Sequence, residues 1–330
     1  MPIFPIISAI LAPAALAELV SARYSLQATP TCRLLKAGIN HTYLVENEHE
    51  KYVWRVYSYQ WRSEAEILEE LRLILTLQQH DIEVSYPVAD RHGNYLQSIQ
   101  APEGIRFGVL FTYALGEKML HFSPETHRAV GEIMARIHQQ TQNLYLDRVT
   151  YSPQVLLVES FVELSQFLPA DTEEWNYMSA LQKYLLKKIE TVDEIAIRQG
   201  AVHLDIWFDN LNVNTDGTIT IFDFDFCGNG WLCLDVAYYF LQTYALDPNS
   251  TTYHAKINDF LLGYELLLPL SAEEKRLVPL LGLCLHFFYL GVQCHRFDNY
   301  SSVFLNEVYL KRYVTTRVKQ YAQFHQIVPE

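Results

Sequence analysis

The residues best suited to chemistry lie between His203 and Asp235. The sequence there reads His-x-Asp, with an asparagine five residues after that aspartate, and then Asp-x-Asp. This stretch has no Lys or Arg, so its carboxylates would repel one another unless a divalent metal or a shared proton compensated them. Asparagine and aspartate oxygens are ligands that a hard ion such as Mg²⁺ prefers. The six aspartates are Asp205, Asp209, Asp216, Asp223, Asp225 and Asp235.

A predicted hairpin would place two candidate metal ligands together. The segment Asn214-Thr215-Asp216-Gly217 is typical of a tight turn between two short strands. Such a hairpin brings Asn210 and Asp223 to the same end of a two-stranded ribbon. Asp205 precedes Asn210 by five residues. A tight loop could therefore set Asp205 beside the metal, where it would orient an attacking hydroxyl and accept its proton.

Other residues of interest also have structural interpretations. We expect His203 to bond nearby backbone rather than shuttle protons, because an aspartate already fills the position of the base. Asp235 is expected to cap a helix and anchor the loop. Asp225 has two open interpretations, a second metal ligand or a solvated acid. The aromatic series at 286–289 could line a substrate pocket or cage a cation, but its helical spacing favours core packing.

The elements that would position these residues fall into two parts, which predicts an α+β fold. The first part is mainly strands, and the second is mainly long helices. We therefore expect a β-rich N-terminal lobe over residues 1–113 and a helical C-terminal lobe over residues 114–330. The predicted strands are 33–36, 42–45, 51–57 and 107–112. The predicted helices are 63–79, 124–140, 154–167, 172–190, 235–246, 252–266 and two more within 273–326.

Composition excludes several classes of protein. Among 330 residues, 50% are hydrophobic and 19% are charged, which is typical of a folded chain rather than a disordered one. The formal net charge of −13, with no basic run, argues against binding to nucleic acid. Five cysteines without a CxxC pair predict reduced thiols in a cytoplasmic protein, with neither disulfides nor a zinc site.

No membrane association is expected from the sequence. The apolar stretch from Ile3 to Ala17 is not preceded by Lys or Arg, and prolines interrupt it. We interpret it, with its continuation to Tyr24, as a packed first helix rather than a secretion signal. Other apolar stretches are interpreted as too short, or too interrupted by polar residues, to cross a bilayer.

The combined pattern resembles the aminoglycoside phosphotransferase and choline kinase family, and bacterial homoserine kinases and stress-response kinases share its layout. The family typically has His-Gly-Asp, an Asn five residues after the Asp, then Asp-[Phe/Trp]-[Asp/Glu] and a later Asp-[Leu/Val]-Ala at a helix start. This chain offers His203-Leu204-Asp205, Asn210, Asp223-Phe224-Asp225 and Asp235-Val236-Ala237. The resemblance covers nearly the whole chain. It implies a bilobal protein-kinase-like fold, with ATP and Mg²⁺ as cofactors and a small-molecule hydroxyl as acceptor.

The resemblance also implies nucleotide-binding residues in the first lobe. Arg55 would reach the phosphates, and Glu70 would hold it, since Glu70 lies closest to the apolar stripe of the 63–79 helix. The remaining candidates are Gly38 and Asn40 in a loop over the phosphates, and Phe111, Thr112 and Ala114 near the adenine. Two positions depart from the family: Leu204 replaces the usual glycine, and Gly38 is the single glycine of the phosphate loop.

The sequence therefore predicts transfer of the ATP γ-phosphoryl group to a small metabolite or antibiotic-like acceptor, with Asp205 as base. Asp235 follows Asp225 by ten residues, which leaves no room for a long phosphorylatable activation segment. The alternatives are a non-catalytic kinase-like module that binds nucleotide or a partner, a protein Ser/Thr kinase of the stress-response type, and a metal-dependent phosphoesterase. No feature of the sequence indicates an oligomeric state, the acceptor's identity or a preference for ATP over GTP.

Overall fold

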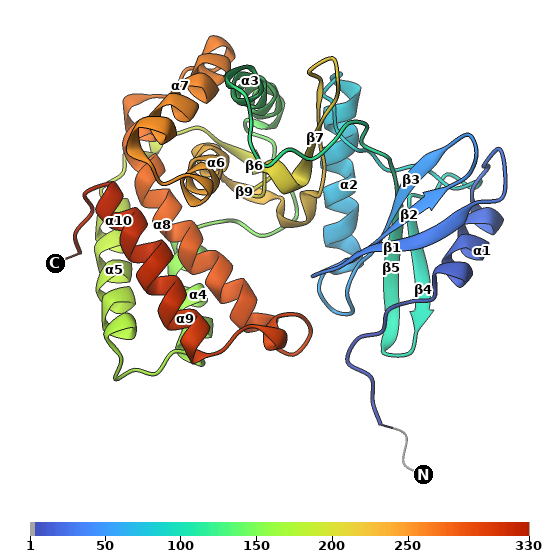
Figure 1. Ribbon diagram of the computed structural model, residues 1–330, viewed down its shortest axis with the longest axis horizontal. Coiled ribbons are helices and arrows are strands. Elements are labelled where there is room, and N and C mark those ends of the chain that lie inside the picture. The colour runs from blue at the N-terminus through green and yellow to red at the C-terminus, as the bar shows by residue number, and fades with distance from the viewer. Residues whose placement is uncertain (1–3, 330) are drawn as a thin grey trace. The chain divides into compact units, whose positions relative to one another are not determined.

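The computed structural model describes residues 4–329, and it divides the chain into two compact units. One unit runs to Leu115 and includes Asp298–Tyr300. The other comprises Gly116–Phe297 and the residues from Ser301 onward. The first contains an antiparallel sheet and the second is largely helical, so the predicted α+β class is confirmed (Figure 1).

The first unit is built on a five-stranded antiparallel sheet in the order β1-β2-β3-β5-β4. Helix α1 begins at a proline, which suits the first helical position. Helix α2 begins at a capping box, in which the Ser63 hydroxyl and the Glu66 carboxylate each bind the other residue's backbone N–H. The elements are α1 Pro13–Arg23, β1 Thr31–Ala37, β2 His41–Glu46, β3 Lys51–Val56, α2 Glu64–Gln79, β4 Leu96–Ala101 and β5 Gly104–Thr112.

Alternation along β3 sends side chains to both faces of this sheet. Trp54 and Val56 are fully buried in a core with α1, where Tyr24 meets the Trp54 ring edge-on at 5.9 Å between centroids. Arg55 and Tyr57 point to the other face, toward α2. Figure 1 shows the two helices on opposite sides of the sheet. The predicted packed first helix is thus confirmed, although it begins only at Pro13.

The second unit is a set of helices around two short strand pairs, β6 with β9 and β7 with β8. Helix α8 packs against α4 and α6. Short 3-10 turns lie at 194–196, 208–210, 224–226 and 301–303. The main elements are α3 Pro124–Thr141, the π-helical η1 Gln154–Glu159, α4 Ser160–Ser165, α5 Glu173–Ile189, β6 Gln199–Val202, β7 Leu211–Val213, β8 Ile219–Ile221, β9 Gly228–Trp231, α6 Cys233–Leu246, α7 Ser250–Leu267, α8 Ala272–His295, α9 Glu307–Tyr313, the π-helical η6 Val314–Val318 and α10 Lys319–Phe324.

Two glycines let α3 and α7 approach closely. A Cβ at Gly131 would lie 2.1 Å from the Phe260 carbonyl oxygen, and one at Gly263 would lie 1.9 Å from the Arg128 carbonyl oxygen. Neither position has room for a side chain, because the obstruction is backbone. The contact holds α7 against the helix that carries His127 and His138.

Helix α8 is the core helix of this unit. Among the described residues it alone is long and apolar enough to cross a membrane, so the expectation that every apolar stretch is too short or too interrupted was wrong for this segment. Yet 78% of its most apolar window is buried inside the protein. The physical reason is that a helix buried on most sides by other helices is apolar nearly all round.

His127 of α3 is a buried histidine whose pKa is lowered by its surroundings. Its Nδ1 lies 2.7 Å from the Tyr239 hydroxyl, and its Nε2 is buried with no hydrogen-bond partner among residues 4–329. Burial, with a smaller contribution from the Lys256 charge, lowers the pKa of His127 to about 4. The folded protein therefore keeps this imidazole neutral at pH values where an unfolded chain protonates it.

We predict that His127 makes the protein acid-sensitive. An unfolded histidine titrates near pH ~6.5. As the pH falls from there to about 4, the unfolded state binds a proton that the folded state does not, so the free energy of unfolding falls, by about 3 kcal/mol for this residue. Urea unfolding of His127→Gln at pH 7, 6, 5 and 4 should give a shallower decline than wild type. The exposed control His49→Gln should keep the wild-type slope, and equal slopes for all three proteins would contradict the prediction.

Candidate active site

The first unit contains a buried ion pair. Arg55 Nη1 donates to Glu70 Oε1 at 2.8 Å, and the Tyr57 hydroxyl donates to Glu70 Oε2 at 3.0 Å. Glu70 is fully buried, and Arg55 lies between the rings of Tyr57 and Phe111, with centroids 5.7 and 5.1 Å from its guanidinium carbon. Both carboxylate oxygens are thus occupied. The arrangement fixes the direction of the guanidinium, as a group that positions phosphates requires.

Three glutamates of α2, Glu66, Glu69 and Glu70, lie in different surroundings. Glu66 forms the capping box with Ser63, and Glu69 pairs with Arg72 at the surface at 2.7 Å. Glu70 alone of the three is buried and faces the sheet. Glu70 therefore lies on the buried face of α2, as its angle to the apolar stripe predicted.

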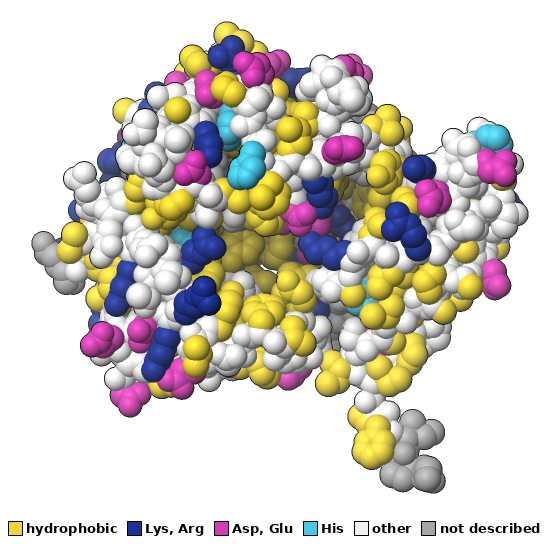
Figure 2. Space-filling model, in the orientation of Figure 1, with side chains coloured by type: hydrophobic (Ala, Val, Ile, Leu, Met, Phe, Trp, Pro, Cys, Tyr) yellow, Lys and Arg dark blue, Asp and Glu magenta, His cyan; other side chains and the backbone are white. Residues whose placement is uncertain are grey.

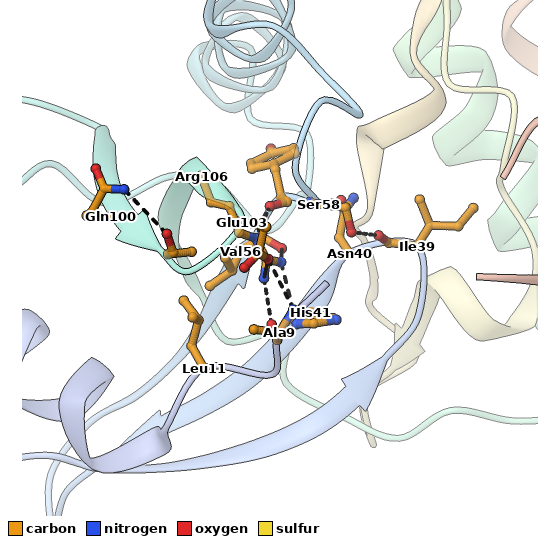
Figure 3. A network of polar contacts seen from close by, with 12 residues as sticks. Ala9, Leu11, Ile39, Asn40, His41, Val56, Ser58, Gln100, Glu103 and Arg106 are labelled. Atoms are coloured by element: carbon orange, nitrogen blue, oxygen red, sulfur yellow. Dashed lines mark hydrogen bonds and ion pairs between the residues drawn. The ribbon is translucent and has the colours of Figure 1, made fainter. Parts of the chain in front are cut away.

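The loop between β1 and β2 is held by Ser58 rather than by glycines. The Ser58 N–H donates to Asn40 Oδ1 at 3.1 Å, and the Ser58 hydroxyl donates to the Ile39 carbonyl (Figure 3). Gly38 N–H donates to the Asn40 carbonyl at 3.1 Å and closes the turn. The Asn40 side-chain oxygen thus fastens the loop to the backbone of Ser58. A Cβ added at Gly38 would make ordinary van der Waals contact, 3.5 Å from the Lys36 side chain.

A buried arginine supports the same region (Figure 3). Arg106 donates to the Tyr57 and Ala9 carbonyls, each at 2.8 Å, and its Nη1 lies 3.3 Å from Glu103 Oε1. Its Nη2 lies 3.4 Å from His41 Nδ1, next to the loop. The N-terminal segment, β2 and β5 are therefore tied together behind the loop.

The expected adenine-binding residues lie at the end of β5. Thr112 N–H donates to the Tyr86 carbonyl at 2.9 Å, and its carbonyl accepts from the Ser85 hydroxyl at 2.6 Å. The backbone of Thr112 is thus engaged within the unit. Phe111 contacts Arg55 with its ring, and Ala114 is buried just beyond the strand.

In the second unit, Asp205 is held by two side-chain donors. Asn210 Nδ2 donates to Asp205 Oδ2 at 2.6 Å and to the Asp205 carbonyl at 3.0 Å. The Tyr238 hydroxyl donates to Asp205 Oδ1. Burial and the neighbouring Asp205 raise the pKa of Tyr238 well above its usual value, so this phenol remains a donor. Asp205 therefore has a fixed orientation and a carboxylate supported on both oxygens.

The backbone around Asp205 is anchored by one buried carboxylate. Asp235 Oδ2 accepts from His203 N–H at 2.9 Å, and Asp235 Oδ1 accepts from Leu204 N–H at 2.6 Å. His138 Nε2 lies 3.1 Å from Asp235 Oδ2. Asp235 lies in the first turn of α6, whose N-cap is Leu232. The expected cap role was therefore wrong, because the carboxylate binds the loop instead of its own helix.

His203 bonds to backbone with both ring nitrogens. Its Nδ1 accepts from Asp205 N–H at 3.1 Å, and its Nε2 lies 3.2 Å from the Phe222 carbonyl. Burial lowers the pKa of His203. A neutral imidazole with one accepting and one donating nitrogen fits these two bonds.

Leu204 has a backbone conformation that glycine adopts more readily. Its φ is +66°, its side chain is fully buried, and its carbonyl accepts from the Tyr289 hydroxyl. The left-handed region costs a non-glycine residue about 1 kcal/mol. The replacement of the family's glycine by leucine therefore has a conformational cost, which the bonds to Asp235 and Tyr289 and the buried side chain offset.

The hairpin brings Asn210 and Asp223 to the same end of the ribbon. Strands β7 and β8 pair Leu211 with Ile221, and Phe222 N–H donates to the Asn210 carbonyl at 3.0 Å. Asp223, which follows, has φ +67°. Because Asn210 Nδ2 is turned to Asp205, its Oδ1 is directed away from that carboxylate and can serve as a ligand.

The oxygen donors fit Mg²⁺ better than a metal that needs a full protein cage. Within residues 4–329, no group of three or more His, Cys, Asp and Glu side chains is arranged to hold a metal. Mg²⁺ is usually bound through one or two carboxylates, waters and substrate phosphates. Asp225, the third candidate ligand, is buried in the turn after Asp223, where Arg148 Nη2 donates to its carbonyl at 2.6 Å.

The sequence reasoning missed Tyr238, and it favoured core packing for Tyr289, whose hydroxyl in fact bonds the Leu204 carbonyl. Tyr238 lies three residues after Asp235, and a helix presents residues i and i+3 on one face. A helix that brings Asp235 to the loop carrying Asp205 therefore brings Tyr238 as well, a signal that was present in the sequence. Tyr289 is 85 residues from its partner Leu204, and no local pattern could have indicated that contact.

Comparison with known proteins places this geometry in a family. A family model described as "Phosphotransferase enzyme family" matches residues 31–268. An uncharacterised protein of Synechocystis sp. is 30% identical over 315 residues, which cover 94% of this chain and 85% of that protein. A homoserine kinase of Methylobacillus glycogenes is 23% identical over 246 residues, covering 74% of this chain and 73% of the enzyme.

Solved structures show the same fold. An amicoumacin kinase in complex with AMP-PNP, Ca²⁺ and its ligand has a TM-score of 0.76 at 21% identity, covering 96% of this chain and 97% of that one. A microcompartment-associated aminopropanol kinase also has a TM-score of 0.76 at 21% identity, with 95% and 97% coverage. The expected kinase-like fold is confirmed by these structures, and the family model shows that the chain belongs to the phosphotransferase enzyme family.

Proposed function

We propose that this protein transfers the γ-phosphoryl group of ATP to a hydroxyl of a small molecule, with Asp205 as the base. The observation that carries the proposal is the support of the Asp205 carboxylate by Asn210 and Tyr238, on a loop anchored by Asp235. A carboxylate held in this way can orient a hydroxyl and accept its proton as the new bond forms.

The proposed reaction is a single displacement. The acceptor oxygen attacks the γ-phosphorus, the bond from that phosphorus to the β,γ-bridging oxygen breaks, and ADP leaves with the electron pair. Asp205 takes the hydroxyl proton. Bound Mg²⁺ would neutralise charge on the β- and γ-phosphate oxygens, and Asn210 and Asp223 would hold it, with Asp225 as a further candidate ligand.

In the first unit, we assign Arg55 to the nucleotide phosphates, with Glu70 and Tyr57 fixing its direction. Gly38 and the loop held by Ser58 would cover the phosphates, and Ala114 would provide backbone contact to the adenine. Cytoplasmic location stays a prediction. It is supported by the five cysteines, which lie outside any disulfide in the described part of the chain, four of them buried.

Replacing the base should separate chemistry from binding. We predict that Asp205→Asn lowers kcat by about 100-fold or more, the usual contribution of a general base, while Mg·ATP still raises the melting temperature. The matched control Asp216→Asn removes the same charge from the exposed hairpin turn and should leave kcat unchanged.

The measurement is ADP release with amino alcohols, sugars, aminoglycosides and homoserine, with the Mg·ATP thermal shift recorded beside it. Turnover that survives Asp205→Asn would remove this residue from the mechanism. A thermal shift without turnover of any acceptor would favour the non-catalytic alternative. Phosphate release from simple esters without ATP would favour a phosphoesterase.

The buried ion pair gives a second prediction. Glu70→Gln keeps a hydrogen-bonding group but removes the charge that directs Arg55, so KM for ATP should rise about tenfold or more, the usual worth of a charged hydrogen bond, while KM for the acceptor stays the same. The control Glu69→Gln changes the preceding residue of α2, which pairs with Arg72 at the surface. Initial-rate kinetics would count against the assignment if both variants behaved alike.

A further inference from the structure

The second unit contains a cleft along its last helices. None of the residues that line it has a role in the proposed phosphoryl transfer. Its lining comes from one stretch of chain, α9 and the helical turns that follow it. Figure 2 shows Lys and Arg side chains gathered over the region of α9 and α10. The lining residues are Tyr309, Arg312, Tyr313, Thr316, Arg317 and Gln320.

The two arginines of this cleft differ from the neighbouring lysine. Lys311 pairs with Glu307 one turn away at 2.7 Å. Within residues 4–329 neither Arg312 nor Arg317 forms an ion pair, and both are exposed. The Arg317 Nη1 donates to the Ala245 carbonyl, at 3.1 Å. The cleft therefore presents two positive charges that no described carboxylate of this unit compensates.

A polar stripe on α8 connects this cleft with the catalytic loop. Its residues, at positions i, i+3 and i+7, lie on one helix face. His286 Nδ1 lies 3.0 Å from the Tyr313 hydroxyl, and Gln293 Oε1 accepts from the Tyr309 hydroxyl at 3.1 Å. Between them, the Tyr289 hydroxyl donates to the Leu204 carbonyl.

These contacts continue from Tyr289 through Tyr238 to Asp205, the proposed base. The Tyr289 ring lies 5.3 Å from the ring of Tyr238, centroid to centroid, and the Tyr238 hydroxyl donates to Asp205. Tyr313 is close enough to Tyr238 to help raise the pKa of that phenol. Burial and the Arg317 charge lower the pKa of His286 to about 3, so His286 is neutral and the charge of the cleft is that of its arginines.

We propose that this cleft binds an anionic group of the phosphoryl acceptor, so that the substrate is a hydroxyl compound carrying a carboxylate or a phosphate. Arg312 and Arg317 would hold the anion, and Tyr309 and Tyr313 would form the wall beside it. Guanidinium groups match the geometry of both anions. An acceptor recognised through a positive charge alone would instead meet two like charges. The inference rests on the proposed function, since it assigns the acceptor of the same base.

The test uses acceptor pairs that differ by the anion. Homoserine and 3-aminopropan-1-ol differ by one carboxylate, and glycerol 3-phosphate and glycerol differ by one phosphate, so the two pairs also distinguish the two kinds of anion. ADP release and identification of the phosphorylated product give kcat/KM for each. We expect the anionic member of at least one pair to be preferred about tenfold or more.

Three variants assign that preference to the cleft. Arg312→Gln and Arg317→Gln should each lower kcat/KM for the anionic acceptor about tenfold, with KM for ATP unchanged. Lys311→Gln, on the same helix but paired with Glu307, should behave as wild type. Preference for the uncharged or amine member, or indifference to both arginine variants, would overturn the inference while Asp205-dependent turnover leaves the proposed function standing.

Calorimetry covers the case in which no panel compound is phosphorylated. Homoserine and glycerol 3-phosphate are titrated into wild type and Arg317→Gln in the presence of AMP-PNP and Mg²⁺. Binding that is lost in the variant supports the anion site. Absence of binding by either compound overturns it, whereas absence of the Mg·ATP thermal shift tells against the proposed function.

Discussion

One buried carboxylate, that of Asp235, holds the loop that carries Asp205 in place. It accepts hydrogen bonds from the His203 and Leu204 backbone and lies beside His138, so three residues from two distant parts of the chain converge on a single side chain. A carboxylate without exposure to water needs such donors to stay buried at tolerable cost. The same bonds keep Leu204 in its left-handed conformation. The direction of Asp205, one residue further on, follows from that constraint together with its bonds to Asn210 and Tyr238.

The first unit uses the same principle with opposite charge. Arg55 is fixed by Glu70, and Arg106 is fixed by carbonyls and Glu103, so each buried cation has oxygen partners in place before any ligand arrives. The loop between β1 and β2, which has a single glycine, is held by Ser58 through the Asn40 side chain and the Ile39 carbonyl. A side chain outside the loop thus fixes the shape of the loop that we propose to cover the phosphates.

The sequence was most informative where geometry is local. The resemblance implied a cation on one strand and an acid on the next helix, and alternation along β3 with the angular position of Glu70 on α2 selected Arg55 and Glu70. The turn at 214–217 was enough to bring Asn210 and Asp223 to one end of a hairpin. Strands β4, β6 and β9 were not anticipated. Strands β6 and β9 have four residues each, and β9 contains two glycines, while the apolar residues of β4 do not alternate regularly, so neither period nor propensity marks these strands. The contact of Tyr289 with the catalytic loop and the place of Arg312 in the cleft depend on tertiary packing, which no local pattern encodes.

Helix α8 is both the core helix of the second unit and a contact between two parts of the proposed site. Most of its surface is packed against other helices, while one stripe of His286, Tyr289 and Gln293 contacts both the catalytic loop and α9. A rotation or shift of α8 would therefore displace the loop and the arginine-bearing wall together. With the acceptor held as we propose, repacking the buried positions of α8 would move both parts of the site, which gives relatives a route to a different acceptor that does not change any residue in contact with it.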